Sequence, residues 1–220
     1  VAPSGRVAYA GRDQDGWYAV VDGRAVGPAF DAILAMQWSA APDQLLGVVE
    51  GESGVHVVRY QLGSGQRTVW LGPRLDAIAA GSLVTSPGGA LAYVGWRGAA
   101  AHAVVNGELG PAFDGLGDLR LDVDGSPSYR GRAGEAAWVV RNGRMEGPYQ
   151  DVAQVLTASH GRRVVAVVLR GGAWHVDDGS WTVQSTKGDE IVLKGMLKIS
   201  VTEDNPNLYL LHLLDGPHRE

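Results

Sequence analysis

The sequence has 220 residues, of which 32 are glycine, seven are tryptophan and none is cysteine, and its formal net charge is −5 at pH 7. The glycines do not recur at every third position, which excludes a collagen-like chain, and the plentiful Val, Leu and Trp with a small net charge exclude a disordered one. The lack of cysteine excludes disulfides, thiolate nucleophiles and zinc–thiolate sites. Apolar runs are too short for a membrane helix, so we expect no membrane span.

Basic residues are unevenly distributed along the chain. The three lysines, Lys187, Lys194 and Lys198, all follow residue 186, and every basic residue before them is arginine. With 19 basic against 24 acidic side chains, we expect no nucleic-acid partner. The composition separates a Lys-bearing segment, residues 187–220, from the rest. The missing cysteines slightly favour an exported or periplasmic protein over a cytoplasmic one.

A turn-centred pattern recurs along residues 1–186. It reads VVDGRAVGPAFD at 20–31, VVNGELGPAFD at 104–114 and VRNGRMEGPYQD at 140–151, with diverged copies at 55–78 and 175–181. The Asp-Gly and Asn-Gly pairs predict two-residue hairpin turns, because both central residues of a type I′ turn need a positive φ. The turn glycines Gly107, Gly143 and Gly179 are spaced by 36 residues, which indicates an internal repeat.

Each repeat is predicted to contain four short strands, which we call A, B, C and D in chain order. Typical examples are Val152–Ala158 for A, AYVG at 92–95 for B, HAVVNG at 102–107 for C and GPAFD at 110–114 for D. These stretches are short, rich in Val and Tyr, and bounded by Gly, Pro, Asn and Asp. No segment keeps a helical apolar period, so very little helix is expected.

Repeated four-stranded antiparallel units of this length predict an all-β fold, a β-propeller. One meander cannot bury both of its faces alone, whereas blades stacked around an axis bury sheet on sheet. A β-sandwich would not explain the similarity between the units. The predicted blades cover five ranges: about 5–34, 35–79, 80–116, 117–152 and 153–186.

The repeat resembles a known family. Ser-Pro-Gly-Gly at 86–89, Ala-Tyr-Val at 92–94, Val-Val-Asn-Gly at 104–107 and Gly-Pro-Ala-Phe-Asp at 110–114 are similar to bacterial WD-like propeller repeats of the TolB type. The resemblance covers about residues 1–186 and implies a propeller fold. It leaves the function open, because these propellers serve many roles. The Trp-Asp ending of eukaryotic WD repeats is missing.

The number of blades depends on residues 187–220. The first repeat has no room for a strand A, and residues 190–201 could supply it by pairing with residues 6–12. This closure favours five blades. In the alternative, residues 190–201 and 207–214 begin a sixth blade. A third interpretation makes the tail a separate β element used in assembly.

Aromatic and histidine side chains share one register on strand C. The set comprises Tyr18, His56, His102, Trp138 and Trp174. Broad side chains at such positions favour packing between blades over a ligand-lining ring. No carboxylate is in register with the histidines, so no metal site is expected. No catalytic residue or cofactor is predicted, because no nucleophile elbow, phosphate loop or metalloprotease motif occurs.

Arginines recur in the turns between strands B and C. They are Arg12, Arg97, Arg132 and Arg170. In a propeller these turns open on one face, so the arginines would surround one mouth of the ring as solvated turn residues or as a site for an anionic small ligand or acidic partner. Trp96 is expected to be exposed beside Arg97, and both residue types are enriched at interface hot spots.

These features lead to a functional hypothesis of a non-enzymatic propeller scaffold that binds a protein partner through one face. The residues expected to bind are Trp96, Arg97, Arg12, Arg132 and Arg170. A small-ligand or glycan sensor is the alternative, and a propeller-type hydrolase or lyase is the remote one. An enzyme is disfavoured because the polar residues are periodic, whereas catalytic residues are usually unique.

Overall fold

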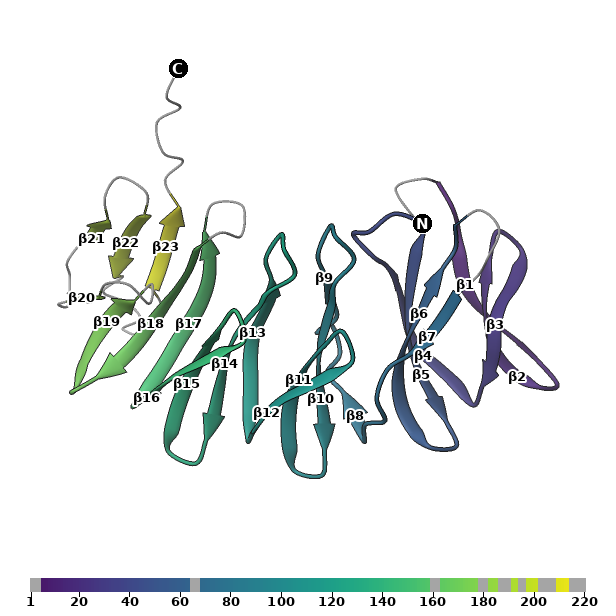
Figure 1. The fold of residues 1–220 in the computed structure, drawn as a ribbon, viewed down its shortest axis with the longest axis horizontal. Helices are drawn as coiled ribbons and strands as arrows, with labels where there is room; N and C mark the ends of the chain where they lie inside the picture. The colour runs from purple at the N-terminus through teal and green to yellow at the C-terminus, as the bar shows by residue number, and fades with distance from the viewer. Residues whose placement is uncertain are drawn as a thin grey trace, which may run out of the picture. The chain divides into compact units, whose positions relative to one another are not determined.

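The computed structural model describes residues 5–63, 68–158, 163–177, 182–185, 191–193, 197–201 and 209–213. Every regular element in these ranges is a β-strand (Figure 1), which confirms the predicted all-β class. None of them contains a helix long and apolar enough to cross a membrane. The hairpin predicted at Gly179 lies outside the described residues, as does most of the Lys-bearing tail.

The chain divides into an N-terminal unit, residues 1–114, and a C-terminal unit, residues 115–220. The N-terminal unit contains three antiparallel sheets. Sheet 1 consists of β1 (Ala8–Asp13), β2 (Gly16–Val21) and β3 (Arg24–Phe30). Sheet 2 consists of β4 (Ala32–Trp38), β5 (Gln44–Gly51), β6 (Gly54–Gln61) and β7 (Thr68–Leu71). Sheet 3 consists of β8 (Ala77–Ile78), β9 (Val84–Thr85), β10 (Leu91–Arg97), β11 (Ala100–Val105) and β12 (Glu108–Phe113).

The C-terminal unit contains three further antiparallel sheets. Sheet 4 consists of β13 (Gly115–Leu121), β14 (Pro127–Ala133), β15 (Ala136–Arg141) and β16 (Arg144–Tyr149). Sheet 5 consists of β17 (Asp151–Ala158), β18 (Arg163–Arg170), β19 (Ala173–Asp177) and β20 (Thr182–Ser185). Sheet 6 consists of β21 (Ile191–Leu193), β22 (Leu197–Val201) and β23 (Tyr209–Leu213).

Sheets 2, 4 and 5 have four strands paired in chain order, as the A–B–C–D pattern predicts. Sheet 1 contains strands B, C and D. In sheet 3 strand A is split into β8 and β9, which both pair with β10. Residues 190–201, which could supply a strand to the first repeat, hold β21 and β22; these pair with each other, and β22 also pairs with β23. The number of blades stays a prediction.

The turns between strands C and D have the geometry that their Asp-Gly and Asn-Gly pairs predict. Asp22 and Asn106 both have a φ of 50°. The Asp22 amide donates to the Val7 carbonyl (3.0 Å), and the Val7 amide donates to Asp22 Oδ1 (3.1 Å). Asn106 makes the same pair of bonds with Leu91, at 2.8 and 2.9 Å. The Val7 amide and the Arg6 guanidinium hold the pKa of Asp22 below its ordinary value. In these two hairpins the turn side chain thus fastens the C–D turn to the start of strand B.

A matched pair of substitutions measures this fastening. Asn142 has the same φ of 50°, but the register places it opposite Pro127, which has no amide hydrogen to donate. We expect Asn106→Ala to lower the free energy of unfolding by about 1–3 kcal/mol more than Asn142→Ala, because only the first leaves an amide without its acceptor. Both variants carry the same backbone strain. Urea unfolding checks the difference, and equal losses would contradict the role of the side chain.

Three cores of the described residues each lie between two consecutive sheets. Representative core residues are Val26, Leu45 and Tyr60 between sheets 1 and 2; Leu46, Leu75 and Tyr93 between sheets 2 and 3; and Ala137, Val155 and Ala166 between sheets 4 and 5. In the N-terminal unit a tyrosine repeatedly lies against a glycine of the preceding strand D. A Cβ added to Gly27 would lie 2.7 Å from the Tyr60 ring, and one added to Gly72 would lie 2.7 Å from the Tyr93 hydroxyl. Burial raises the pKa of Tyr60 to about 12. Sheet-on-sheet packing therefore depends on glycine as well as on apolar side chains.

Candidate functional site

The four predicted arginines are exposed at or beside the ends of strand B. Arg12 and Arg97 belong to the N-terminal unit, and Arg132 and Arg170 belong to the C-terminal unit. Arg12 lies over the ring of Trp17, with its guanidinium carbon 5.9 Å from the ring centroid. Such a contact at an exposed position contributes about 0.5–1 kcal/mol. That all four surround one mouth stays a prediction.

Trp96 and Arg97 form the end of β10 in sheet 3. Trp96 is half-buried instead of exposed, and its backbone lies between Ala77 of β8 and Ala101 of β11. Arg97 is exposed, and its Nη2 donates to the carbonyl of Arg74 (3.3 Å).

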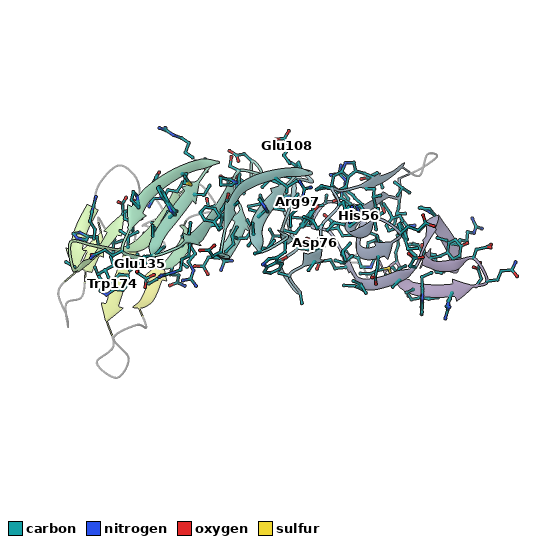
Figure 2. All side chains as sticks on the ribbon, turned by 90° about the horizontal axis from the view of Figure 1, so that it is seen from below. His56, Asp76, Arg97, Glu108, Glu135 and Trp174 are labelled. Atoms are coloured by element: carbon teal, nitrogen blue, oxygen red, sulfur yellow. The ribbon has the colours of Figure 1, made fainter. Side chains whose placement is uncertain are left out.

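The turn that follows Arg97 is held by Asp76. The Gly98 amide donates to Asp76 Oδ2 at 2.6 Å, and Figure 2 shows the side chains of Arg97 and Asp76 in the same part of the sheet. Sheet 5 repeats this contact, because the Gly172 amide donates to Gln150 Oε1 at 2.8 Å. The segment before strand A therefore braces the B–C turn of its own sheet, and this recurrence is typical of a structural role.

Arg132 lines a cleft in the C-terminal unit. Its Nη2 lies 2.8 Å from Asp151 Oδ1, at the start of β17. The cleft has a volume of about 200 Å³ and combines two arginines, one carboxylate and several glycines. Its lining includes Gly115, Gly117, Arg130, Arg132, Asp151 and Val152. We call it the arginine cleft.

Arg130 is the residue of this cleft that the sequence reasoning missed. Its Nε lies 3.1 Å from Asp118 Oδ2, and its Nη1 donates to the Val152 carbonyl at 2.9 Å. Asp118 Oδ2 also accepts from the Val155 amide (3.0 Å), so one carboxylate joins strand A of sheet 4 to strand A of sheet 5. A comparison of equivalent positions in strand B is the sequence signal that could have found Arg130.

A second cleft lies between sheets 2 and 3 of the N-terminal unit. It has a volume of about 160 Å³ and an apolar lining that includes Leu34, Leu46, Ile78 and Leu83. It lies where strand A of sheet 3 is interrupted between β8 and β9. At this interruption Ser82 Oγ accepts a hydrogen bond from the Val94 amide of β10 at 3.0 Å.

The two histidines of the strand C register form hydrogen bonds with backbone carbonyls in or next to strand D of their own sheets. His56 Nδ1 donates to the Gly72 carbonyl at 3.0 Å, and His102 Nδ1 donates to the Gly110 carbonyl at 2.9 Å. Both acceptors are the glycine of a Gly-Pro pair in or next to strand D. These bonds support packing as the role of this register. Among the residues that the structure describes, no three histidine or acidic side chains are grouped as a metal site would require.

Comparisons with known proteins were made with the sequence and with the structure. No family model matches the chain, and no curated protein matches it. Among solved structures, the chain is similar to the β-propeller domain of Cps50 (Swd1) from Myceliophteria thermophila, with 13% identity, a TM-score of 0.37, and coverage of 91% of this chain and 78% of the other.

Two further solved structures are similar to the chain. The β-propeller domain of the trilobed protease from Pyrococcus furiosus has 9% identity and a TM-score of 0.38, over 80% of this chain and 81% of the other. KlHsv2 with loop 6CD replaced by a Gly-Ser linker has 12% identity and a TM-score of 0.35, over 94% of this chain and 80% of the other.

Proposed function

We propose that the chain is a β-propeller scaffold of the bacterial WD-like, TolB type, which binds a protein partner through the ends of its sheets that carry the B–C turns. The proposal for the fold is supported by the repeated A–B–C–D order of sheets 2, 4 and 5 and by the recurring C–D turns. In this proposal the sheets are blades that close into a ring.

The number of blades is part of this proposal. The described residues form six sheets, and all of them except sheet 3 pair their strands strictly in chain order, so the six-blade ring is the simpler arrangement. The five-blade ring, completed by residues 187–220, is the competing arrangement. In both arrangements another sheet covers the face of sheet 1 that points away from sheet 2, because every blade of a closed propeller lies between two neighbours.

The B–C end of sheet 3 carries the proposal for the partner. Arg97 and half-buried Trp96 are adjacent there, and contacts to Arg74 and Asp76 brace the turn before any partner arrives. A braced tryptophan–arginine pair is suited to an interface, because little side-chain and turn mobility is lost on binding. No catalytic step is part of the proposed function.

The double substitution Trp96→Ala/Arg97→Ala tests the partner proposal. We expect it to reduce the amount of captured partner at least tenfold in quantitative pull-downs, because it removes both anchors of the turn. Arg144→Ala/Met145→Ala is a matched control, since it also removes an exposed arginine and its neighbouring apolar side chain, but at a C–D turn. Equal capture by the double variant and the control would refute the assignment.

The arginine cleft favours a second candidate function, a sensor of a small anionic ligand. A ligand that binds only the folded state raises the melting temperature by mass action. A thermal-shift screen with anionic metabolites and sugars tests this candidate, and a uniformly flat response counts against it.

A further inference from the structure

Arg130 departs from the repeat that accounts for most turn and core residues of this chain. The five B–C hairpins align on residue pairs that flank the turn, such as Arg97 with Ala100 and Ala133 with Ala136. In this alignment the position of Arg130 holds an apolar residue in the other four strands B: Ala10, Val48, Val94 and Val167. A residue required by blade packing recurs from sheet to sheet, so this arginine needs another explanation.

Arg130 and Arg132 form a pair on one face of β14. Residues two apart in a strand point to the same side and lie about 7 Å apart. The side chains remain 42% and 50% exposed, although each is held by a carboxylate, Arg130 by Asp118 and Arg132 by Asp151. A guanidinium has five N–H donors. The contacts within the described residues use two of them on Arg130 and one on Arg132, so donors remain for a further acceptor.

The space beside these guanidinium groups suits a single side chain. Its volume of about 200 Å³ is below the roughly 300–1,000 Å³ of clefts that enclose a drug-sized ligand. Glycines keep it open: no atom lies within 4 Å of where a Cβ of Gly115 would be, while a Cβ at Gly117 would lie 3.2 Å from Arg130 Nε. Side chains at these positions would fill the cleft or displace the arginine.

The charges favour a carboxylate as the occupant. Arginine binds planar carboxylates through two parallel hydrogen bonds. Asp118 and Asp151 flank the two guanidinium groups, so the local charge is balanced before binding. Their repulsion opposes a phosphate, with a charge near −2, more strongly than a singly charged carboxylate.

We propose that the arginine cleft receives an aspartate or glutamate side chain of the protein partner. This inference rests on the proposed function, because it names the chemistry by which that partner is recognised. Arg130 and Arg132 donate to the carboxylate, while Asp118 and Asp151 hold the two guanidinium groups in place. The cleft is a recognition site and performs no covalent chemistry.

The test uses an end-blocked tetraglutamate peptide as the probe and tetraglutamine as its uncharged counterpart, with binding to the full chain followed by NMR titration. We expect the tetraglutamate to bind and the tetraglutamine to bind at least tenfold more weakly. Arg132→Gln and Gly115→Val should each weaken tetraglutamate binding at least tenfold, the first by removing a donor and the second by filling the cleft. Melting temperatures establish that both variants fold.

Two variants serve as matched controls. Arg144→Gln removes an exposed arginine of the same unit, and Gly51→Val adds a side chain at another glycine whose Cβ would meet no atom within 4 Å. Both should bind tetraglutamate as the unmodified chain does. The inference is overturned if tetraglutamate does not bind, if both cleft variants bind it normally, or if inorganic phosphate binds more tightly. Partner loss in Trp96→Ala/Arg97→Ala without tetraglutamate binding would refute this inference alone.

Discussion

Replacing Arg141 with methionine is expected to lower the free energy of unfolding of the C-terminal unit by about 3–5 kcal/mol. Arg141 is only 6% exposed, and its Nη1 forms an ion pair with Glu146 of its own sheet. It also reaches sheet 5, where Nη1 lies 3.4 Å from Asp177 Oδ1 and Nη2 donates to the Asp177 carbonyl at 2.8 Å. The substitution would remove both contacts of this cation with buried Asp177, and removing one partner of a buried ion pair is costly.

Arg144→Met is the matched control for this prediction. Arg144 is directly opposite Arg141 in the β15–β16 ladder but is exposed, so its replacement should change stability by no more than about 0.5 kcal/mol. Adding Asp177→Leu to Arg141→Met should recover part of the loss, because it removes the buried carboxylate that has lost the contact with Arg141. Urea unfolding monitored by tryptophan fluorescence measures all three variants. A loss below about 1 kcal/mol for Arg141→Met would show that the ion pairs do not stabilise the contact between sheets 4 and 5.

Tyr93→Ala is expected to lower the free energy of unfolding of the N-terminal unit by about 3–5 kcal/mol, as for other large buried aromatic side chains. Tyr93 is fully buried between sheets 2 and 3, with its hydroxyl against Gly72. Removal of the ring would leave a cavity beside Leu75 and other core residues, and the surroundings of such a cavity relax only in part. Calorimetry or urea unfolding measures the loss, and a cost below about 1.5 kcal/mol would contradict this description of the core.

Tyr9 is the residue of sheet 1 that is equivalent to Tyr93, and the substitution Tyr9→Ala tests whether the ring closes. Aligned on the B–C hairpins, Tyr9 and Tyr93 occupy one position, yet Tyr9 is 50% exposed and Tyr93 is 0% exposed. Val7 and Leu91 show the same contrast, at 47% and 0%. In the proposed closed ring a further sheet covers the face of sheet 1 that carries Tyr9. In that case Tyr9→Ala should lower the free energy of unfolding by more than about 2 kcal/mol. A cost within about 0.5 kcal/mol would mean that the face is uncovered and that the ring does not close.

Several features of the fold were predictable because they depend on near neighbours in the chain. The turns at Asp22-Gly23 and Asn106-Gly107 require positive φ, and few residues tolerate it, so these dipeptides mark the hairpins directly. Short alternating stretches between such turns then predict strands paired in chain order. The partial burial of Trp96 was not predictable in this way, because the exposure of a side chain depends on tertiary packing and not only on its neighbours in the chain.

The candidate site was predictable only in part. Arg132 was identified because arginine recurs in the B–C turns, whereas Arg130 differs from its equivalents in the other strands B and has no such recurrence. Asp118 and Val152 come from strands A of two different sheets, and nothing near Arg130 in the chain indicates either contact. The separation of the four arginines into two units was likewise not evident from their spacing.

Residue order alone was enough to decide the all-β class, the C–D turns and the four-stranded repeat, because each depends on backbone preferences within a few neighbouring residues. The packing of sheet on sheet decided the rest: the contact of Arg141 with Asp177, the burial of Tyr93 against Gly72 and the opening beside Arg130. Those contacts join residues in or next to consecutive sheets. The energies of these contacts depend on how close the residues lie and on the exclusion of water. Both are set only when the sheets stack.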